Sequence, residues 1–309
     1  MDLRSQPMAH VPRLQTVSAP HLCEKVKIDA PRPVSQNRAM MWRVWALGVC
    51  LGVSAAAWAV APDQRDFMYD GATYRLVVFD PARGPISPRV VLAPALTPVG
   101  ELMGPDRPIA AITGTFFAWE TGQPVGEVVV NGDVLTEGAR GSVLAVDWLG
   151  RVSIFDVPVR EWTDYFPYRF ALRATIRVIR DGRIDPRPWD QGFRDRGLWG
   201  SAARTCVGTT PGGKLVMAAT RNNVTLSQLG RALASQGVNN LVALDGGGST
   251  FLYANGRTLI GTMRPLSNLF VVYDEDPLDD GYRAHLSRLA RNQTNGVARG
   301  ASGRNTASR

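Results

Sequence analysis

The chain contains very little histidine, cysteine or lysine, and this shortage excludes several kinds of catalytic site. Its three histidines, His10, His21 and His285, all lie outside residues 62–280. That segment has a single cysteine and a single lysine. A Ser-His-Asp triad would lack its base there, and a zinc site built from histidine and cysteine would lack its ligands. Chemistry in this segment therefore depends on Asp, Glu, Ser, Thr, Tyr, Arg and backbone amides.

Metal binding and disulfide formation are restricted for the same reason. A carboxylate-only site for Mg²⁺ or Ca²⁺ remains open, but the sequence has no EF-hand-like loop. Because Cys206 is alone in residues 62–280, no disulfide can form within that segment, and its stability must come from a hydrophobic core. We expect no metal ion and no cofactor.

The net charge of +8 suggests a nucleic acid or a membrane as partner, but the distribution of charge argues against nucleic acid. Much of the excess lies at the two ends, since residues 281–309 hold six arginines and no acidic residue. The middle of the chain is close to neutral. Nowhere does the sequence interleave basic and aromatic residues in the way that stacks bases. We therefore expect no nucleic-acid partner.

A long uncharged run near the start points to export. Residues 41–61 read MWRVWALGVCLGVSAAAWAVA, in which Arg43 is the only charge. The end of the run, Ala-Trp-Ala at 57–59, has the small-x-small form of a signal-peptidase site. The run is also long enough to cross a bilayer as an uncleaved anchor. Both readings, signal peptide and single transmembrane anchor, place the rest of the chain on the periplasmic or extracellular face.

The remaining boundaries follow from composition. Residues 1–40 are rich in proline and lack periodicity, so they are expected to be a disordered segment or the product of a mis-called start before Met40 or Met41. Residues 281–309 form a basic tail of low hydrophobicity that we expect to be disordered. Residues 62–280 are then one domain.

Hairpin signals dominate this domain. Asn-Gly or Asp-Gly lies between apolar runs in residues 127–135, 176–184 and 251–260. Looser hairpins are expected in residues 144–155 and 207–219. The pattern predicts an α+β fold, with mostly antiparallel or mixed sheets built from hairpins and few helices.

One helix and one long loop stand out. Residues 225–237 carry a capping box, Thr225 with Gln228, and end at Gly237, so they are predicted to be helical. Residues 185–202 contain Pro, Gly, Arg and aromatic residues without periodicity. Loops of this length in a domain are usually functional or disordered, and the aromatic residues favour a loop that borders a site.

A glycine-rich stretch follows the predicted strand after that helix. Residues 241–253 read LVALDGGGSTFLY, so a buried strand ends in Asp245 and leads into three glycines, Ser249 and Thr250. Glycines permit positive φ and let successive amides converge on an anion. The stretch is neither a Walker loop nor a dinucleotide fingerprint. A tight turn between two strands is the alternative interpretation.

This stretch resembles the Leu-Asp-Gly-Gly-Gly-Ser signature of the phosphodiester glycosidase family. Further family landmarks occur in order: ITGTFFAWETGQPVGEVVVNG at 112–132, ARTCVG at 203–208 and MRPLSNLFVVY at 263–273. The resemblance covers residues 109–273. The sequence departs from the family at one point, because Thr113-Gly114-Thr115 stands where Asn-Gly-Gly usually precedes Phe-Phe.

The resemblance implies a hydrolase that cleaves a sugar-1-phosphodiester at the C1–O bond and expels a phosphomonoester, in envelope or exopolysaccharide metabolism. It makes Asp245 the candidate for the carboxylate at C1 and Arg204 a candidate for stabilising the leaving anion. A second carboxylate would be Glu127 or Glu120. Substrate or phosphate contacts would come from a larger set: Gly246, Gly247, Gly248, Ser249, Thr250, Arg264, Thr205, Thr115 and Phe116.

Two other functions remain open at this stage. A non-catalytic glycan-binding module on the same fold is motivated by the departure at residues 113–115. A metal-dependent phosphodiesterase that cuts the P–O bond is the other. For the glycosidase and for the glycan-binding module, the partner is a sugar-phosphate diester or polysaccharide. Residues 41–61 would contact the membrane.

Overall fold

The computed structural model describes residues 61–278, 281–283 and 285–287. Among these residues no helix is long and apolar enough to cross a membrane. The expected signal or anchor segment and the N-terminal stub fall on residues 1–60, outside the described residues.

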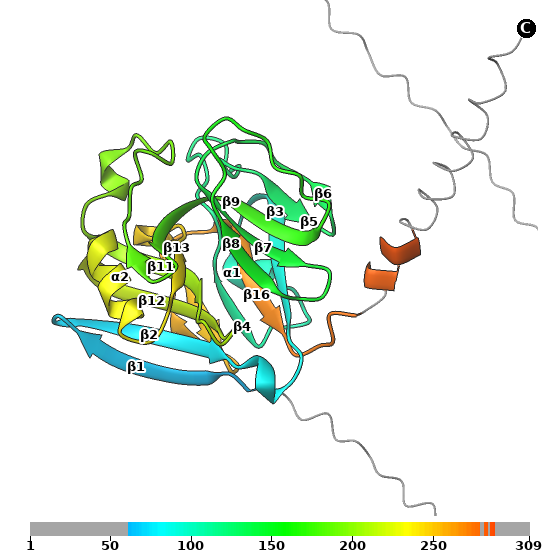
Figure 1. Cartoon of the computed structure of the whole chain (residues 1–309), viewed down its shortest axis with the longest axis horizontal. Coiled ribbons are helices and arrows are strands. Elements are labelled where there is room, and N and C mark those ends of the chain that lie inside the picture. The colour runs from blue at the N-terminus through cyan, green and yellow to red at the C-terminus, as the bar shows by residue number, and fades with distance from the viewer. Residues whose placement is uncertain (1–60, 279–280, 284, 288–309) are drawn as a thin grey trace, which may run out of the picture. The chain divides into compact units, whose positions relative to one another are not determined.

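Two antiparallel sheets make up the described part of the chain (Figure 1). The main path of the larger sheet is β1 (Asp63–Tyr69), β2 (Ala72–Phe79), β12 (Leu215–Val224), β11 (Ala202–Thr209), β13 (Asn240–Ala243), β9 (Tyr168–Arg180), β5 (Val128–Val130) and β6 (Asp133–Val134). Strand β9 also pairs with β10 (Arg183–Ile184) and with β7 (Ser142–Asp147), which in turn pairs with β8 (Val152–Phe155). The long β9 is therefore the strand on which the larger sheet is organised.

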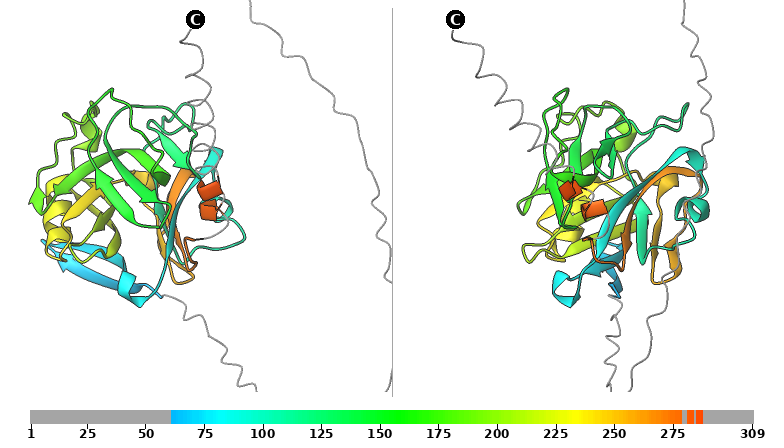
Figure 2. Two further views of the ribbon diagram at one scale, coloured as in Figure 1. Left: turned by 45° about the vertical axis from the view of Figure 1, so that its right-hand side comes forward. Right: turned by 90° about the vertical axis from the view of Figure 1, so that its right-hand side faces the viewer.

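The smaller sheet has the order β15 (Arg257–Ile260), β14 (Leu252–Ala254), β4 (Ala110–Thr113), β16 (Leu266–Tyr273) and β3 (Ser87–Thr97). Figure 2 shows the cyan β3 and the orange β16 running side by side. The helical elements are short: α1 (Val99–Leu102), α2 (Leu226–Ala234), and the 3₁₀ turns η1 (Pro81–Arg83), η2 (Arg196–Leu198) and η3 (Gly247–Ser249). The predicted α+β class with few helices is confirmed.

The principal core lies between the two sheets. The larger sheet contributes Leu144, Leu172 and Met217, and the smaller sheet contributes Ile112 and Phe270, all of them fully buried or nearly so. These side chains come from alternate positions of their strands, as a sheet with one face on a core requires.

A second core lies on the other face of the larger sheet. There α2 packs Leu226, Leu229 and Leu233 against residues such as Ile176 of β9 and Cys206 of β11. Figure 1 shows α2 on the side of the larger sheet away from β3 and β16. Because both of its faces are covered, β9 reads as an almost continuous buried run.

The hairpin and helix predictions are confirmed in detail. The turns Asn131-Gly132, Asp181-Gly182 and Asn255-Gly256 have positive φ at both residues, the requirement of a type I′ turn. The capping box of Thr225 and Gln228 is formed in both directions. The β1–β2 hairpin through Asp70-Gly71 was not predicted, because its first strand is mostly polar and exposed.

The expected irregular tail needs a correction at its start. Residues 281–283 and 285–287 are helical. The ring of His285 stacks on that of Trp148, with centroids 3.9 Å apart. This packing partner lies far away in the sequence, so composition could not reveal it. The rest of the tail, residues 288–309, lies outside the described residues.

The core between the sheets yields a stability prediction. Phe270→Ala removes a fully buried ring of β16 and should lower the free energy of unfolding by about 3–5 kcal/mol. The control is Phe166→Ala, because the Phe166 side chain is 57% exposed. Chemical denaturation followed by circular dichroism measures both. Equal effects of the two substitutions would contradict the assigned core.

Candidate functional site

Asp245 lies where the chain leaves the larger sheet for the smaller one. It lies two residues beyond the end of β13 at Ala243, and its backbone is held from two sides. The Asp245 amide donates to the Gly114 carbonyl at 3.0 Å, beyond the end of β4. The Asp245 carbonyl accepts from the Thr205 hydroxyl of β11 at 2.5 Å. The carboxylate is therefore delivered to a fixed point between the two sheets.

The glycines after Asp245 are needed for packing and for backbone geometry. A Cβ on Gly246 would lie 2.5 Å from the Ala203 carbonyl oxygen, so no larger residue fits there. Gly247 has φ of +57°, in the left-handed region that favours glycine. The turn then closes as η3 and enters β14.

Only part of this turn is free to bind an anion. The Gly246 amide donates to the Asp245 carboxylate. The amides of Ser249 and Thr250 donate to the carbonyls of Gly246 and Gly247, at 3.0 and 3.2 Å. Within the described part of the chain, the backbone amides of Gly247 and Gly248 have no hydrogen-bond acceptor. The sequence predicted that successive amides of this turn could bind an anion, and two N–H groups remain available to do so.

Ser249 and Arg264 complete a polar cluster around Asp245. The Arg264 Nε donates to the Ser249 Oγ at 2.7 Å, and the Arg264 Nη2 lies 3.8 Å from the Asp245 Oδ2. The Ser249 hydroxyl is also hydrogen-bonded to the Asp245 carboxylate. The sequence elements that position these groups are β13, η3 and the segment between β15 and β16. The structure therefore brings together three of the predicted site residues.

Two aromatic rings flank the Arg264 guanidinium. Its Cζ lies 5.3 Å from the centroid of Phe117 and 5.1 Å from that of Trp119, within the range of cation–π attraction. Trp119 is 63% exposed. Neither ring was singled out from the sequence, although both belong to the TFFAW stretch that follows β4. An exposed indole of this kind presents an apolar face and a polar edge, which suits it to an interface with a ligand.

Burial raises the pKa of Asp245 to about 6, and hydrogen bonds from Ser249 and the Gly246 amide, together with the charge of Arg264, limit that rise. A carboxyl group with a pKa near neutrality can exchange its proton close to working pH. Burial thus leaves this aspartate with a pKa at which its proton can be exchanged near neutral pH, although the charge of Arg264 opposes the rise.

Residues 113–115 have structural contacts in this chain. The Thr115 hydroxyl donates to the carbonyls of Arg173 and Ala174 in β9, at 2.6 and 2.8 Å. The Thr113 hydroxyl donates to the Ser249 carbonyl at 2.5 Å. The side-chain oxygen of Asn268 accepts from the Thr115 amide at 2.7 Å, so β16 supplies a carboxamide beside this turn. Asn268 was not predicted, since nothing separates it from other strand residues in the sequence.

Phe116 and Thr250 are buried beside the cluster. Phe116 packs edge-on against Phe193, with centroids 5.6 Å apart, and belongs to the core that covers the larger sheet. The Thr250 hydroxyl is buried and has no hydrogen-bond partner within the described residues.

Arg204 is held by backbone carbonyls. It is 4% exposed and donates from Nε to the Val224 carbonyl at 3.1 Å and from Nη1 to that of Leu198 at 3.1 Å. Its Nη2 donates to the Gly200 carbonyl. Among the described residues, no hydrogen bond or ion pair joins Arg204 to Asp245. Its guanidinium fastens the end of the loop at residues 185–202 to the larger sheet.

Glu127 likewise lies apart from the Asp245 cluster. Its carboxylate is fully buried and forms an ion pair with Arg173 of β9 at 2.9 Å. It also accepts a hydrogen bond from the Tyr165 hydroxyl at 2.6 Å. Glu120 is exposed, next to Trp119. Among the described residues no group of three or more His, Cys, Asp or Glu could hold a metal ion.

Solved structures share this fold. A zebrafish N-acetylglucosamine-1-phosphodiester alpha-N-acetylglucosaminidase catalytic domain, auto-inhibited by its pro-peptide, is 18% identical with a TM-score of 0.56, and the match covers 69% of this chain and 82% of that one. A hypothetical protein from Synechocystis is 16% identical with a TM-score of 0.51, covering 68% of this chain and 61% of that one.

Sequence comparison gives the family. A search of curated proteins finds no match. The model of the phosphodiester glycosidase family, however, matches residues 106–273, which are more than half of the 309 residues. The matched range contains Asp245, the glycine turn and Arg264, which confirms the resemblance noted in the sequence. The chain therefore belongs to the phosphodiester glycosidase family.

Proposed function

We propose that this protein is an exported hydrolase that cleaves a sugar-1-phosphodiester at the C1–O bond. The observation that carries the proposal is the cluster of Asp245, Ser249 and Arg264, in which a buried carboxyl with a pKa of about 6 lies beside a guanidinium. Family membership supports the reaction class. The zebrafish relative is named for action on an N-acetylglucosamine-1-phosphodiester.

The charge of each group determines the role that we assign to it in the reaction. Arg264 and the free amides of Gly247 and Gly248 would stabilise the negative charge of the departing phosphomonoester. Because that leaving group is already an anion of low basicity, it needs charge stabilisation more than protonation. The ionised Asp245 would act at C1 as nucleophile or general base, where positive charge develops. Trp119 offers a face on which the sugar ring can stack.

In this proposal Arg204 and Glu127 act on the site indirectly. Arg204 binds carbonyls at the end of the loop at residues 185–202, and Glu127 binds Arg173. Both would position loops around the substrate. Export, and a role in envelope or exopolysaccharide metabolism, are supported by the uncharged run and Ala-Trp-Ala sequence at residues 41–61.

The first test is Asp245→Asn, which preserves shape and removes the charge. We expect kcat for a nitrophenyl-phospho-sugar or UDP-sugar to fall by about 10³-fold, the scale on which removing one electrostatic component of a site acts. The matched control is Asp133→Asn, an exposed carboxylate of β6, which should retain the wild-type rate.

Hydrolysis in ¹⁸O-labelled water identifies the bond that breaks. Attack at C1 places the label on the sugar, whereas attack at phosphorus places it on the phosphate. Label on the phosphate would favour a phosphodiesterase over the proposed glycosidase. Binding of glycan without turnover of any such diester would favour a binding module.

The raised pKa predicts a pH-dependent stability difference. The ordinary aspartate pKa is 3.8, and that of Asp245 in the folded chain is about 6. The folded state therefore binds the proton more tightly than the unfolded state, and stability falls as pH rises through this window. At pH ~8 Asp245→Asn should be more stable than wild type, by up to about 3 kcal/mol, and the difference should vanish below pH ~4.

Denaturant titrations at a series of pH values measure this difference, with Asp133→Asn as the control that should follow wild type. A constant difference between Asp245→Asn and wild type at all pH values would contradict the assigned titration. In the same protein, kcat/KM should rise as pH increases through about 6, because the ionised carboxylate is the active form.

Two arginine substitutions separate chemistry from structure. Arg264→Lys should lower kcat/KM by about 10- to 100-fold, since one ammonium cannot bond Ser249, face Asp245 and bind phosphate at once. Arg204→Lys should instead lower the free energy of unfolding by about 2–3 kcal/mol, because buried carbonyls lose their donors. Kinetics and denaturation of both variants are the measurement. A large rate effect without destabilisation for Arg204→Lys would move Arg204 into the catalytic machinery.

A further inference from the structure

A polar pocket outside the Asp245 cluster is lined by three arginines. The cavity has a volume of about 660 Å³, and its lining residues are Ala139, Arg140, Val159, Arg160, Gly192 and Arg194. No carboxylate lines it. Within the described residues none of the three arginines forms an ion pair, and all three are exposed. Three unpaired positive charges facing one cavity attract anions strongly.

The three segments that carry these arginines are bonded to one another. The Arg160 amide donates to the Ala139 carbonyl at 2.8 Å, and the Gly141 amide donates to the Gln191 carbonyl at 2.8 Å. A Cβ on Gly192 would lie 3.2 Å from both the Arg140 Cβ and a Val159 methyl. Glycine at this position therefore lets the three segments approach closely.

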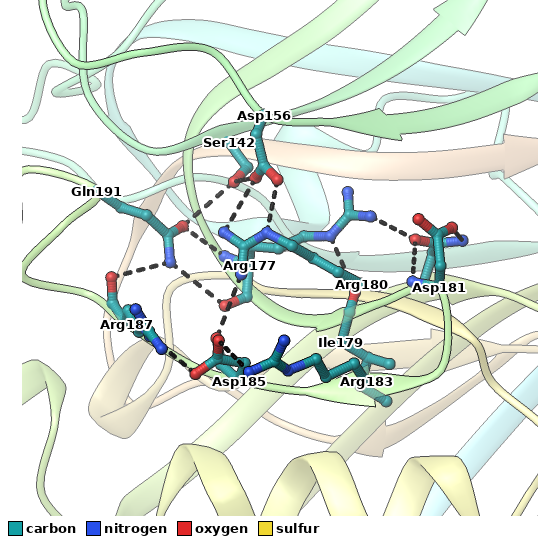
Figure 3. Close-up of polar contacts among 11 residues, drawn as sticks. Ser142, Asp156, Arg177, Ile179, Arg180, Asp181, Arg183, Asp185, Arg187 and Gln191 are labelled. Atoms are coloured by element: carbon teal, nitrogen blue, oxygen red, sulfur yellow. Dashed lines mark hydrogen bonds and ion pairs between the residues drawn. The ribbon is translucent and has the colours of Figure 1, made fainter.

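Buried side chains fix the same segments to the larger sheet. The Gln191 side chain accepts from the Arg177 amide at 2.7 Å and from the Ser142 hydroxyl at 3.2 Å, as Figure 3 shows. Arg173 donates to the carbonyls of Pro158 and Glu161, at 3.2 and 2.8 Å, on either side of Arg160. The backbone segments that carry the three arginines are thus held in place before any ligand arrives, which lowers the entropic cost of binding.

Aromatic residues pack on both sides of the segment that carries Arg194. The Arg194 guanidinium lies 3.7 Å from the centroid of Trp189, which fixes its direction. Phe193, between the lining residues Gly192 and Arg194, packs against Phe116. Phe116 directly precedes Phe117, whose ring faces Arg264. Phe116 and Phe193 are both buried, so this contact packs the segment behind the pocket against the segment that leads to Phe117.

We propose that Arg140, Arg160 and Arg194 bind an oxyanion, a phosphate or carboxylate group, that is carried by a glycan chain. The inference rests on the proposed function and makes its substrate an anionic polysaccharide rather than a small diester. Guanidinium groups suit both oxyanions, because each can be bound by two parallel N–H donors. A concave pocket of this volume fits a sugar with its anionic group better than an extended nucleic-acid strand, which needs an open basic track.

Isothermal titration calorimetry on the full chain tests the pocket. The probes are inorganic phosphate, a poly(sugar phosphate) oligosaccharide, a polyuronate of equal length, a neutral dextran and a single-stranded oligonucleotide. We expect both anionic glycans to bind, with affinity that falls as salt is added, and the dextran not to bind. The tighter of the two anionic glycans identifies the group that the pocket prefers.

The variant is the triple substitution R140Q/R160Q/R194Q, which should raise the Kd for the anionic glycan by about tenfold or more. The matched control is R83Q/R107Q/R257Q, which removes three exposed arginines elsewhere and should keep the wild-type Kd. The control also accounts for attraction to the basic tail. Arg194→Gln alone, which keeps two charges in the pocket, should give a smaller loss.

Several outcomes would overturn the proposal: equal losses in the two triple variants, binding of dextran as tight as that of the anionic glycans, or tighter binding of the oligonucleotide. Turnover is not needed for these measurements. If wild type binds anionic glycan through the three arginines but hydrolyses no sugar-1-phosphodiester, the proposed reaction fails and the pocket stands. If it hydrolyses such diesters and the triple variant binds normally, the pocket fails alone.

Discussion

The buried ion pair between Glu127 and Arg173 holds together the segments around β9, including the loop that carries Arg160. Both side chains are fully buried, so each gives up its hydration, at a cost of several kcal/mol per ion. The attraction between them, the Tyr165 hydroxyl and the carbonyls of Pro158 and Glu161 offset that cost. The compensation is incomplete, since Glu127 Oε1 and Arg173 Nε have no partner within the described residues. A pair of this kind contributes little net stability, and its value here is that it fixes several segments relative to one another.

Arg173 can make these contacts because β9 is irregular at this position. The neighbouring Ala174 has φ of +61°, and the register with β7 shifts there. Such a conformation costs about 1–3 kcal/mol in a non-glycine residue. The Thr115 hydroxyl bonds both carbonyls of this bulge, and Gly126 allows close approach, since a Cβ there would lie 2.8 Å from the Ala174 amide. The bulge thereby joins the segment leading to Phe117 with the loops that carry the arginine pocket.

Local sequence signals predicted most of the fold, because the turns and the helix start are determined by residues close together in the sequence. Asn-Gly and Asp-Gly turns, and the Thr225 capping box, act over a few residues and leave a readable pattern. The turn after Asp245 could also be predicted from the sequence, because only glycine fits against the Ala203 carbonyl and the glycines therefore appear in the sequence. The hydrogen-bond and ion-pair partners of Arg204 and Glu127 could not be predicted from the sequence. A strand arginine that binds carbonyls and one that binds phosphate have the same sequence signature, and the difference arises from contacts between segments distant in the chain. Trp119 and Asn268 escaped selection for the same reason.

The contact between Asp245 and Arg264 is longer than a close ion pair, and this affects the pKa of the aspartate. With Arg264 Nη2 at 3.8 Å, the guanidinium gives less stabilisation than a bidentate pair would, because its Nε is engaged by Ser249 and its face by two aromatic rings. Burial therefore dominates, and the pKa rises to about 6 instead of falling. A close bidentate pair would hold the carboxylate ionised and also occupy the donors that a phosphate requires. In the proposed reaction, the aromatic rings and Ser249 would keep Arg264 near enough to bind the leaving anion and far enough to leave Asp245 free to act at C1.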